Sequence, residues 1–583
     1  MITVNNYSID KRKNDGIFYT PSFLADYLAK KVLHYLGDNK AFSIIDPACG
    51  DSILLRSFIK ELSNLQVPFP KVIGIDKDRN AINNSKAKVK DMNIKSLQTQ
   101  FIHTDALFPS NTENPEQGWK KIKEVAKCKS GFTIALSNPP WGSDLNGYTS
   151  SKLSSNFILA KGQFDIFDLF YETIANNMEA NGIFGLILPD SVFSQEQAKF
   201  RELLAKNSTI FLIARLGEKI FPEINRACSI IIAQNSLPEN HHLVDCFRLS
   251  SDYKKQVIAN EKSLEEVERE LSHKVLQKRF LENKNFGFDI DLKIEEQNLY
   301  NKIQTKSSPL NKYIKSTRGA EISKKGIVCL CPNCKIWMPF PRATKPVCNN
   351  CHIEFDPEKV ITDKIITSIK TSDNFIFKSG EDLFRFTSRA KSYIDLSKNG
   401  INYKNTDIYQ NTKILVRKTG IGVTASIDYD HAITNQVVYI LNVKPEFENK
   451  LSLEFVLAVL NSRVSTYYLI KKYGENEWRT HPYLTQTALM NLPIPSLDFD
   501  DITTVSAIKK ITHIVRTDVK SSNEKNISRT NDIIIERMIA DLFHLSELDY
   551  ETIFETLKNS EQLIPIKRLL NCNPKEIFSL HGI

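Results

Sequence analysis

Residues 16–236 alternate short apolar runs with amphipathic segments, and this alternation constrains the fold of the 583-residue chain more than any other feature. The apolar runs have the length of strands, and the segments between them repeat apolar residues at helical spacing. Strands that alternate with helices form a sheet that helices cover on both faces. The sequence therefore predicts an α/β domain, in which ligands bind beyond the carboxyl ends of the strands.

The individual elements of this domain can be placed from the same pattern. Strands are expected over residues 42–46, 71–76, 99–103, 132–137, 182–188, 210–216 and 228–234. Helices are expected over residues 52–65, 78–91 and 164–178. A further helix should follow Thr20 and Pro21, with Thr20 as its N-cap and Pro21 at its first position.

The sequence Asn138-Pro139-Pro140-Trp141 directly follows the fourth expected strand. The two prolines stiffen the backbone and remove two N–H donors, which leaves the Asn138 side-chain oxygen and the Pro139 carbonyl as outward-facing acceptors. Two convergent acceptors suit an NH2 group, because they hold its hydrogens and leave the nitrogen lone pair free to attack. Trp141 offers a flat face on which a base can stack. A structural turn beside a core tryptophan is the alternative interpretation.

Three carboxylates stand at the ends of the first three expected strands. Asp46 begins the turn Asp46-Pro47-Ala48-Cys49-Gly50, whose small residues let a ligand approach the backbone at the start of a helix. Asp76 ends the second strand, where a carboxylate can take two ribose hydroxyls. Asp105 follows the third strand and can accept a hydrogen bond from an adenine amino group. Each residue alone suggests a cap or a loop, but together they predict a nucleoside pocket.

The motifs, taken in order, resemble the γ class of DNA adenine-N6 methyltransferases. Those are S-adenosylmethionine-dependent enzymes of restriction–modification and related systems. The resemblance rests on residues 16–21, 46–50, 75–76, 105 and 138–141, and it continues through 164–170, 188–190 and 216–222. It implies a Rossmann-like class I methyltransferase domain, S-adenosylmethionine as cofactor, and a flipped-out adenine as target.

The resemblance also implies residue roles. Cofactor binding is expected from Tyr19, Thr20, Pro21, Asp46, Ala48, Gly50, Asp76, Asp105 and Asn138. The target adenine is expected to meet Asn138, Pro139, Pro140 and Trp141, with Phe221 on the other face of the base. One departure stands at Ser52, where the family usually has a glycine that is free to adopt a positive φ.

Two Cys-x-x-Cys pairs stand 13 residues apart, formed by Cys331 with Cys334 and by Cys348 with Cys351. Four thiolates at this spacing suit a closed tetrahedral site, so a structural Zn2+ ion and a zinc ribbon over residues 329–352 are expected. A redox role is the alternative, although redox pairs usually occur singly.

Residues near the cysteines leave two questions open. Cys329 and His352 are close enough in the sequence to be alternative ligands. The ribbon also carries basic and aromatic side chains that are either DNA contacts or a solvated surface, namely Lys335, Trp337, Arg342 and Lys345.

The chain is expected to have four parts. These are a catalytic domain at 1–245, a helical connector at 246–299, a mixed α+β target recognition domain at 300–495, and a helical region at 496–583. The connector should hold one charged helix that starts at the capping box of Ser263 and Glu266 and runs to about residue 282. Basic and amide side chains in 415–420, 434–436 and 478–483 are expected to contact phosphates and base edges.

Composition indicates which partners and which cellular compartment are expected. The 77 Lys and Arg against 68 Asp and Glu give a net charge of +9, which is compatible with a polyanionic partner. No apolar run reaches the roughly 18 residues of a membrane span, and the polar, basic residues 1–13 predict no signal peptide. Ten mostly isolated cysteines favour a reducing compartment. A cytoplasmic protein without membrane contact is expected.

The leading hypothesis is a site-specific DNA methyltransferase that acts on N6 of adenine in double-stranded DNA, as the modification component of a restriction–modification or related phage-defence system. A separate restriction endonuclease or defence-complex subunit is a second expected partner. A fused nuclease is not expected, because the motifs begin at Gly16 and no persuasive PD…ExK arrangement follows. The alternatives are an RNA adenine or protein-glutamine methyltransferase, a subunit that needs a separate specificity chain, and a non-catalytic DNA-binding subunit on a methyltransferase scaffold.

Overall fold

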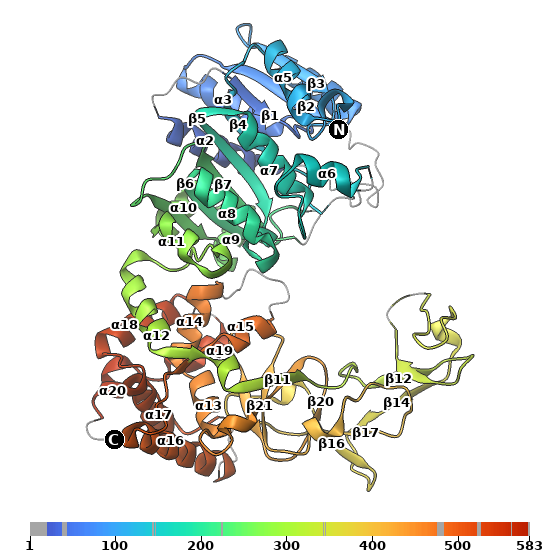
Figure 1. Cartoon of the computed structure of the whole chain (residues 1–583), viewed down its shortest axis with the longest axis vertical. Helices are drawn as coiled ribbons and strands as arrows, with labels where there is room; N and C mark the ends of the chain where they lie inside the picture. The colour runs from blue at the N-terminus through green and yellow to red at the C-terminus, as the bar shows by residue number, and fades with distance from the viewer. Residues whose placement is uncertain are drawn as a thin grey trace. The chain divides into compact units, whose positions relative to one another are not determined.

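The structure is a computed structural model that divides into two compact units. It describes residues 20–37, 43–142, 145, 147–222, 226–341, 343, 345–474, 483–521, 526–560 and 563–580. The first unit ends at Ile294 and the second begins at Glu295. Figure 1 colours the first unit from blue to green and the second from green to red.

The strands of the first unit form one sheet, which has nine strands among the described residues, in the order β3-β2-β1-β4-β5-β7-β6-β8-β9. Their bounds are β1 (Ser43–Asp46), β2 (Lys71–Asp76), β3 (Thr99–His103), β4 (Phe132–Ser137), β5 (Met178–Pro189), β6 (Thr209–Gly217), β7 (Cys228–Gln234), β8 (Leu243–Arg248) and β9 (His273–Leu276). Strands β1 to β5 run parallel, and β7 is antiparallel to β5 and β6. The predicted Rossmann-like α/β domain is confirmed.

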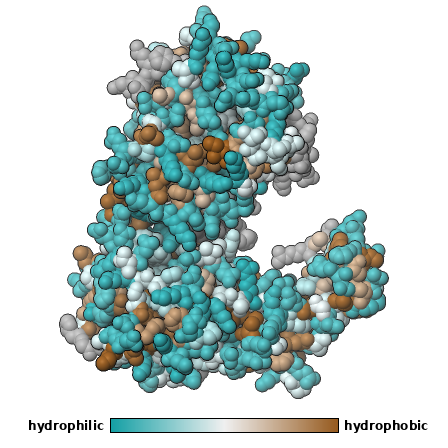
Figure 2. All heavy atoms as spheres, viewed as in Figure 1, coloured by the Kyte–Doolittle hydropathy of each residue, from teal (hydrophilic) through white to brown (hydrophobic). Residues whose placement is uncertain are grey.

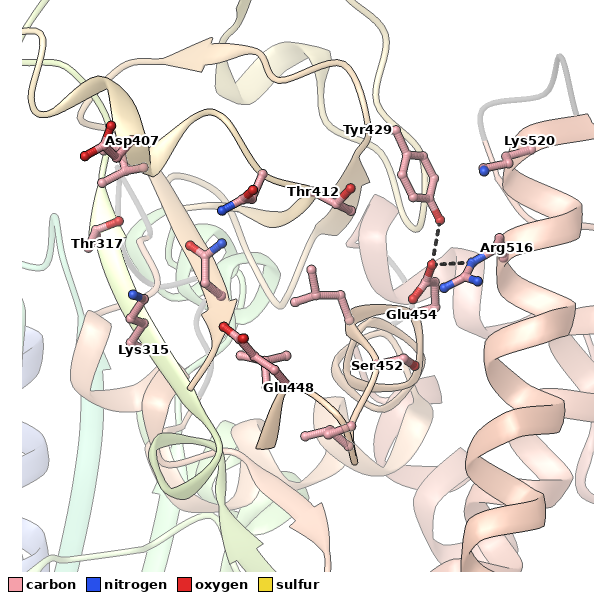
Figure 3. A pocket seen from close by; sticks show the side chains of 16 residues that line it. Lys315, Thr317, Asp407, Thr412, Tyr429, Glu448, Ser452, Glu454, Arg516 and Lys520 are labelled. Atoms are coloured by element: carbon pink, nitrogen blue, oxygen red, sulfur yellow. Dashed lines mark hydrogen bonds and ion pairs between the residues drawn. The ribbon is translucent and has the colours of Figure 1, made fainter. Parts of the chain in front are cut away.

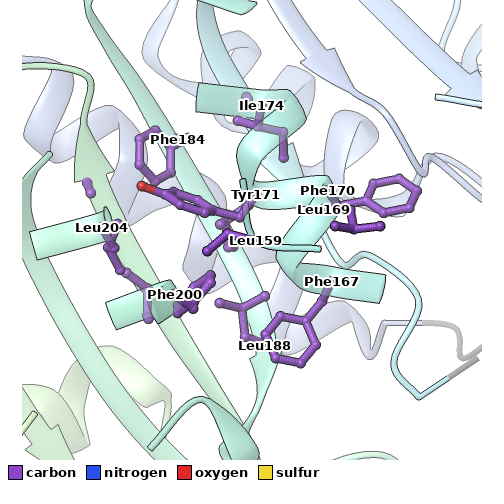
Figure 4. Close-up of a cluster of buried hydrophobic side chains, with 14 of the residues drawn as sticks. Leu159, Phe167, Leu169, Phe170, Tyr171, Ile174, Phe184, Leu188, Phe200 and Leu204 are labelled. Atoms are coloured by element: carbon purple, nitrogen blue, oxygen red, sulfur yellow. The ribbon is translucent and has the colours of Figure 1, made fainter. Parts of the chain in front are cut away.

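Helices cover both faces of this sheet, because neighbouring strand residues point to opposite sides. On β1, Ile44 joins one apolar cluster and Ile45 the other. The helices on the Ile44 side are α2 (Ser22–Leu36), α3 (Ile53–Leu65), α4 (Arg79–Lys90), α9 (Ser251–Ile258) and α10 (Leu264–Leu271). Those on the Ile45 side are α5 (Pro115–Val125), α6 (Ser150–Asn156), α7 (Ile166–Asn177), α8 (Ala198–Asn207) and α11 (Gln277–Glu282). Figure 4 shows part of the second cluster, where Tyr171 of α7 lies near Phe184 of β5 and Phe200 of α8.

The start of α2 corrects one expectation. The helix begins at Ser22, so Pro21 is the N-cap residue and not the first helical residue, and no side chain caps the helix. The Thr20 hydroxyl instead accepts a hydrogen bond from Asn138 Nδ2 at 3.1 Å. The Thr20 hydroxyl, which the local pattern predicted to cap the helix, therefore takes part in a tertiary hydrogen bond instead.

The continuous charged helix predicted within residues 246–299 is also wrong. The capping box of Ser263 and Glu266 does open α10, but this helix ends at Leu271. The chain then forms β9, in which Val275 is fully buried and pairs with Val244 of β8. Pairing at the edge of the sheet overrides the helical pattern, and the segment through Ile294 belongs to the first unit.

The second unit carries several small sheets. The first contains β11 (Ile314–Arg318), β21 (Val438–Val443), β18 (Lys413–Arg417) and β19 (Ala425–Asp428) in that order. The second contains β15 (Ile366–Thr367), β17 (Ser392–Asp395), β16 (Asn374–Lys378) and β20 (Ile433–Thr434). A ribbon contains β13 (Trp337–Pro339), β12 (Ile327–Leu330) and β14 (Thr362–Lys364), and β10 (Ser307–Pro309) pairs with β22 (Pro493–Pro495). The mixed α+β architecture expected after residue 300 is confirmed.

Helices complete the second unit and confirm the helical pattern predicted near the C-terminus. They are α12 (Gln297–Thr305), α13 (Leu453–Leu460), α14 (Arg463–Tyr473), α15 (Gln486–Met490), α16 (Ile502–Ser521), α17 (Arg529–Leu542), α18 (Glu547–Lys558), α19 (Ile564–Lys567) and α20 (Pro574–Phe578). No helix among the described residues is both long enough and apolar enough to span a membrane.

A buried ion network joins these helices to the sheets. Arg463 of α14 is fully buried and contacts two carboxylates of α17, Glu536 at 2.9 Å and Asp532 at 3.0 Å. Arg385, which follows β16, contacts the same Asp532 at 2.6 Å. Burial alone would raise the pKa of Asp532, but the charges of Arg385 and Arg463 hold it well below its usual range. The C-terminal helices are thus tied to the sheet region by charge pairs that water does not reach.

The second unit also holds a pocket of about 910 Å³ between strands β11 and β21 and helices α13 and α16. In Figure 3, Tyr429 and Arg516 both point to Glu454, whose Oε1 accepts from Tyr429 Oη at 3.0 Å and from Arg516 Nε at 2.7 Å. Three basic and three acidic side chains line the pocket, namely Lys315, Arg516, Lys520, Asp407, Glu448 and Glu454. The lining therefore favours neither an anion nor a cation.

Candidate active site

The turn after β1 is built around Asp46, which is 1% exposed. Its Oδ1 accepts hydrogen bonds from Ala48 N at 3.0 Å and from Ser137 Oγ at 3.1 Å. The second bond fixes the turn against the residue that precedes Asn138. Burial raises the pKa of Asp46 to about 7, although the hydrogen bonds from Ala48 and Ser137 act in the opposite direction.

Gly50 forms the ligand-accessible part of this turn. Its φ is +49°, and a Cβ at this position would meet nothing within 4 Å, so the backbone faces open space. Its N–H donates to Asp76 Oδ2 at 2.8 Å, and its carbonyl accepts from Ser85 Oγ at 2.8 Å. Cys49 is buried beside it.

Ser52 occupies the left-handed region, with φ +63° and ψ +23°, at the N-cap of α3. Serine therefore adopts a left-handed conformation here, which glycine could adopt at no steric cost. Its Oγ donates to the Asp51 carbonyl at 2.6 Å. The departure seen in the sequence thus stands at a strained position.

We expect Ser52→Gly to raise the free energy of unfolding of the first unit by about 0.5 to 1 kcal/mol, since about 1 to 2 kcal/mol of left-handed strain is removed and part of that is offset by glycine's larger unfolded entropy. Chemical denaturation checks this value. The matched control is Gln66→Gly at the other end of α3, where φ is +55°. Gln66→Gly should raise the free energy of unfolding by a similar amount and leave the affinity for the cofactor unchanged. A lower free energy of unfolding in Ser52→Gly would contradict the strain argument.

Asp76 and Asp105 follow on the next strands of the sheet. Asp76 accepts from Gly50 N and, through Oδ1, from Asp78 N at 2.8 Å, so each oxygen keeps a lone pair for a further donor. Burial raises its pKa. Asp105 accepts from Leu107 N at 2.9 Å and from Tyr148 Oη at 2.7 Å. Tyr148 carried no motif in the sequence, and only the fold brings it to this carboxylate.

The Asn138-Pro139-Pro140-Trp141 turn lies at the carboxyl end of β4, beside the Asp46 turn. Trp141 and Phe221 are each 2% exposed, and their ring centroids are 5.2 Å apart at an interplanar angle of 80°. The two rings thus contact each other edge to face. Of the other predicted cofactor residues, Thr20 reaches Asn138, whereas Tyr19 lies outside the described residues.

Two further side chains hold this turn, and neither was among the predicted site residues. Asp165, at the N-cap of α7, accepts from Gly142 N at 2.8 Å. Arg226 Nη1 donates to the Trp141 carbonyl at 3.1 Å. The Asp-x-x-Asp pattern at 165–168 forms a capping box, and this local pattern could have indicated Asp165. No local pattern marks Arg226.

The second candidate site is a cluster of four cysteines. The Sγ atoms of Cys331, Cys334, Cys348 and Cys351 lie within 4.8 Å of one another. Two of the pairs, Cys331 with Cys351 and Cys334 with Cys348, are separated by 3.7 Å. Four thiolates at the usual Zn–S distance form a tetrahedron with edges of about 3.8 Å, so this spacing fits a zinc ion. Cys329 and His352 lie outside the cluster.

The ribbon around the cysteines is anchored to the rest of the second unit through Trp337. The Trp337 side chain packs against the apolar cluster of the sheets, and Lys398 lies over its ring. The backbone N–H of Trp337 donates to the Asn399 carbonyl at 3.0 Å. A Cβ at Gly400, where φ is +99°, would collide with Ile336. Trp337 is therefore a half-buried contact between the ribbon and the sheets.

Two of the basic side chains that were expected to be DNA contacts or solvated surface have partners within the ribbon. Lys345 pairs with Glu354, and Lys335 Nζ donates to the Pro332 carbonyl at 2.7 Å, while Arg342 lies outside the described residues. Large exposed hydrophobic side chains gather in this stretch, at Ile327, Phe340, Val347, Ile353, Ile361, Ile369 and Phe375. Figure 2 shows brown spheres on the part of the surface that Figure 1 labels β12 and β14.

Comparison with known proteins decides the family. The family model described as N-6 DNA Methylase matches residues 2–312, which is more than half of the chain. The chain belongs to the N-6 DNA methylase family. A second model, the TaqI-like C-terminal specificity domain, matches residues 376–494 and covers most of the sheets of the second unit. The cysteine ribbon lies between the two matched segments.

Two curated relatives of this methylase family match parts of the chain. The Type II methyltransferase M.BanIII of Aneurinibacillus aneurinilyticus is 27% identical over 223 residues, which are 36% of this chain and 37% of that protein. The Type I restriction enzyme MpnII methylase subunit of Mycoplasma pneumoniae is 24% identical over 153 residues, 26% of either chain. The chain thus spans about a third or less of the length of these relatives.

The solved structure of the Type IIL restriction-modification enzyme MmeI in complex with DNA shares the fold. The match has a TM-score of 0.56 and 12% identity, and it covers 96% of this chain and 80% of that chain. The shared fold extends over both units of this chain.

Proposed function

We propose that this methylase transfers a methyl group from S-adenosylmethionine to N6 of an adenine flipped out of duplex DNA, as the modification component of a restriction–modification or related defence system. The observation that carries the proposal is the Asn138-Pro139-Pro140-Trp141 turn, which shares a hydrogen-bonded frame with the Asp46 turn through Ser137. The groups that we assign to the target amino group therefore adjoin those that we assign to the nucleoside of the cofactor.

The chain's residues fit S-adenosylmethionine. The glycine backbone at Gly50 faces open space. We assign the Asp46 carboxylate to the positive charge of the cofactor, Asp76 to the ribose hydroxyls and Asp105 to the adenine amino group. When bound, S-adenosylmethionine supplies an activated methyl group, so the protein needs no nucleophile of its own. Tyr148 would help to orient the Asp105 carboxylate toward the cofactor adenine.

The target adenine would be held by the turn itself. Asn138 uses its amide nitrogen as donor to Thr20, so its side-chain oxygen is the atom that we assign to one hydrogen of the target amino group. The Pro139 carbonyl would take the other hydrogen. Trp141 and Phe221 would enclose the base, which requires their edge-to-face contact to separate. These groups orient the amino nitrogen and exclude water, which lowers the barrier chiefly through positioning.

Cofactor affinity should depend on pH through Asp46. Its pKa of about 7 means that the carboxylate forms as pH rises, and an anion favours a cationic sulfonium. Asp76, whose pKa burial also raises, acts in the same direction. We expect the Kd for S-adenosylmethionine to fall about five- to tenfold between about pH 6 and pH 8. Calorimetry at each pH measures it, and Asp46→Asn should flatten the dependence. Tighter binding at the lower pH would contradict the assignment.

Long-read modification sequencing tests the function as a whole. The chain would be expressed alone in a host that lacks DNA methylation. N6-methyladenine at one recurring motif is the expected result, and it would establish the reaction, the substrate and the specificity together. An unmodified genome from well-expressed, cofactor-binding protein would instead support an RNA or protein substrate or a missing partner subunit.

We further propose that the cysteine cluster holds one structural zinc ion, since its Sγ spacing fits a tetrahedral site. Metal analysis of the purified protein should give about one zinc per chain, lost in Cys334→Ser and in Cys348→Ser. The matched control is Cys329→Ala, a buried cysteine of the same ribbon that lies outside the cluster. Zinc lost equally in the control, or absent from the parent protein, would remove the site.

A further inference from the structure

The backbone that carries Trp141 is held from outside the motif. Trp141 forms one wall of the proposed base slot, yet its indole Nε1 is buried and makes no hydrogen bond to any described residue. Its ring contacts Phe221 only edge to face. The ring also packs in a buried apolar cluster, and the contacts of its main chain add a second constraint on its orientation.

Two groups hold that main chain. Asp165 accepts from Gly142 N at 2.8 Å, and Arg226 Nη1 donates to the Trp141 carbonyl at 3.1 Å. The guanidinium also lies against Gly142, because a Cβ built there would be 2.7 Å from Nη1 and 3.1 Å from Nη2. The φ of Gly142 is +56°. Glycine at position 142 thus permits both the left-handed backbone of the turn and the close approach of the Arg226 guanidinium.

Arg226 itself stands on a fixed frame. The carbonyl of the next residue, Ala227, accepts from Asp190 N at 2.8 Å. Asp190 is buried at the end of β5 in an ion pair with Arg215 of β6. Arg226 is exposed, but the backbone of the residue that follows it is hydrogen-bonded to the end of β5.

We propose that Arg226 is a positioning residue for the target adenine. It contacts the Trp141 carbonyl and the Gly142 turn, and so acts together with Asp165 and the apolar packing of the ring to orient Trp141 in the base slot. This inference rests on the proposed function. Because Arg226 contacts neither Asp46 nor Asp76 in the structure, it should act on the target base and leave the cofactor unaffected.

The test separates these two effects. In Arg226→Ala we expect kcat on duplex DNA to fall about 10- to 100-fold, as for a misplaced reacting group, with the Kd for S-adenosylmethionine unchanged. With 2-aminopurine at the target position, the fluorescence increase on base flipping should be smaller than in the parent. Arg226→Lys, which keeps one donor but loses the flat contact with Gly142, should recover part of kcat. Arg79→Ala, an exposed arginine of α4, is the matched control.

A double-mutant cycle tests the contact itself. Gly142→Ala should displace the guanidinium and lower both kcat and Tm, but it should lower them less in an Arg226→Ala background, where nothing remains to displace. Strictly additive changes in Tm would overturn the contact, and parental kcat and 2-aminopurine fluorescence in Arg226→Ala would overturn the positioning role. The Tm cycle does not need methyl transfer. Coupled Tm values in a protein without activity on DNA would therefore uphold the contact and overturn only the proposed function.

Discussion

Replacement of Asn138 by alanine is expected to lower kcat by about 10²- to 10³-fold, the usual effect of removing one preorganised polar group from a reacting centre. The amide oxygen would no longer orient the target amino group, and the Pro139 carbonyl alone cannot hold both hydrogens. Cofactor binding should change little, because the groups around Gly50 and Asp76 stay in place.

Initial rates on a DNA carrying the recognition motif, together with calorimetric binding of S-adenosylmethionine, measure the two quantities separately. Asn83→Ala is the matched control, since Asn83 is exposed on α4 and far along the chain from the turn. Full activity in Asn138→Ala would refute the mechanism. Loss of cofactor binding with loss of activity would place Asn138 in the cofactor site.

Replacement of Asp532 by alanine should lower the free energy of unfolding of the second unit by about 3 to 5 kcal/mol, the effect of breaking a buried ion pair. Arg463 would keep only Glu536 as an acidic partner, and Arg385 would lose the carboxylate at 2.6 Å. An arginine buried without enough negative charge cannot regain its hydration unless the helices separate.

Urea denaturation followed by circular dichroism measures this loss in the full chain. Asp541→Ala on the same helix is the control, because Asp541 pairs with Arg537 at the surface and such pairs contribute about 0.5 kcal/mol. Equal losses in the two variants would mean that the network stabilises the unit no more than a surface pair does.

Much of the first unit was predictable because its periodicity and the positions of its polar residues agree. Strand β1 is buried on both faces and ends on Asp46, and β2 likewise ends on Asp76, so local sequence was enough to place both carboxylates. The unusual conformation of Ser52 was also predictable, since the turn requires a left-handed backbone at this position whatever the side chain.

The misses share one physical cause, which is tertiary contact overriding local preference. The Thr20 hydroxyl was expected to cap α2 but accepts from Asn138 instead. The stretch around Val275 carries a helical pattern, yet it pairs with β8 because the sheet edge offers partners that a helix does not. Tyr148 and Arg226 reach the site by packing across long sequence separations, and no spacing rule records that.

The shared Asp532 has a consequence for exchanging specificity between related enzymes. The segment that resembles a specificity domain, 376–494, contains Arg385 and Arg463, but the carboxylates that neutralise them lie on α17, outside that segment. A transplant cut at the boundaries of the sequence match would carry two buried cations into a host without their counter-charges. A chimaera that preserves folding would have to move the block from Glu295 through α17 and α20 as one piece, so the transferable part of this protein is larger than the part that sequence similarity outlines.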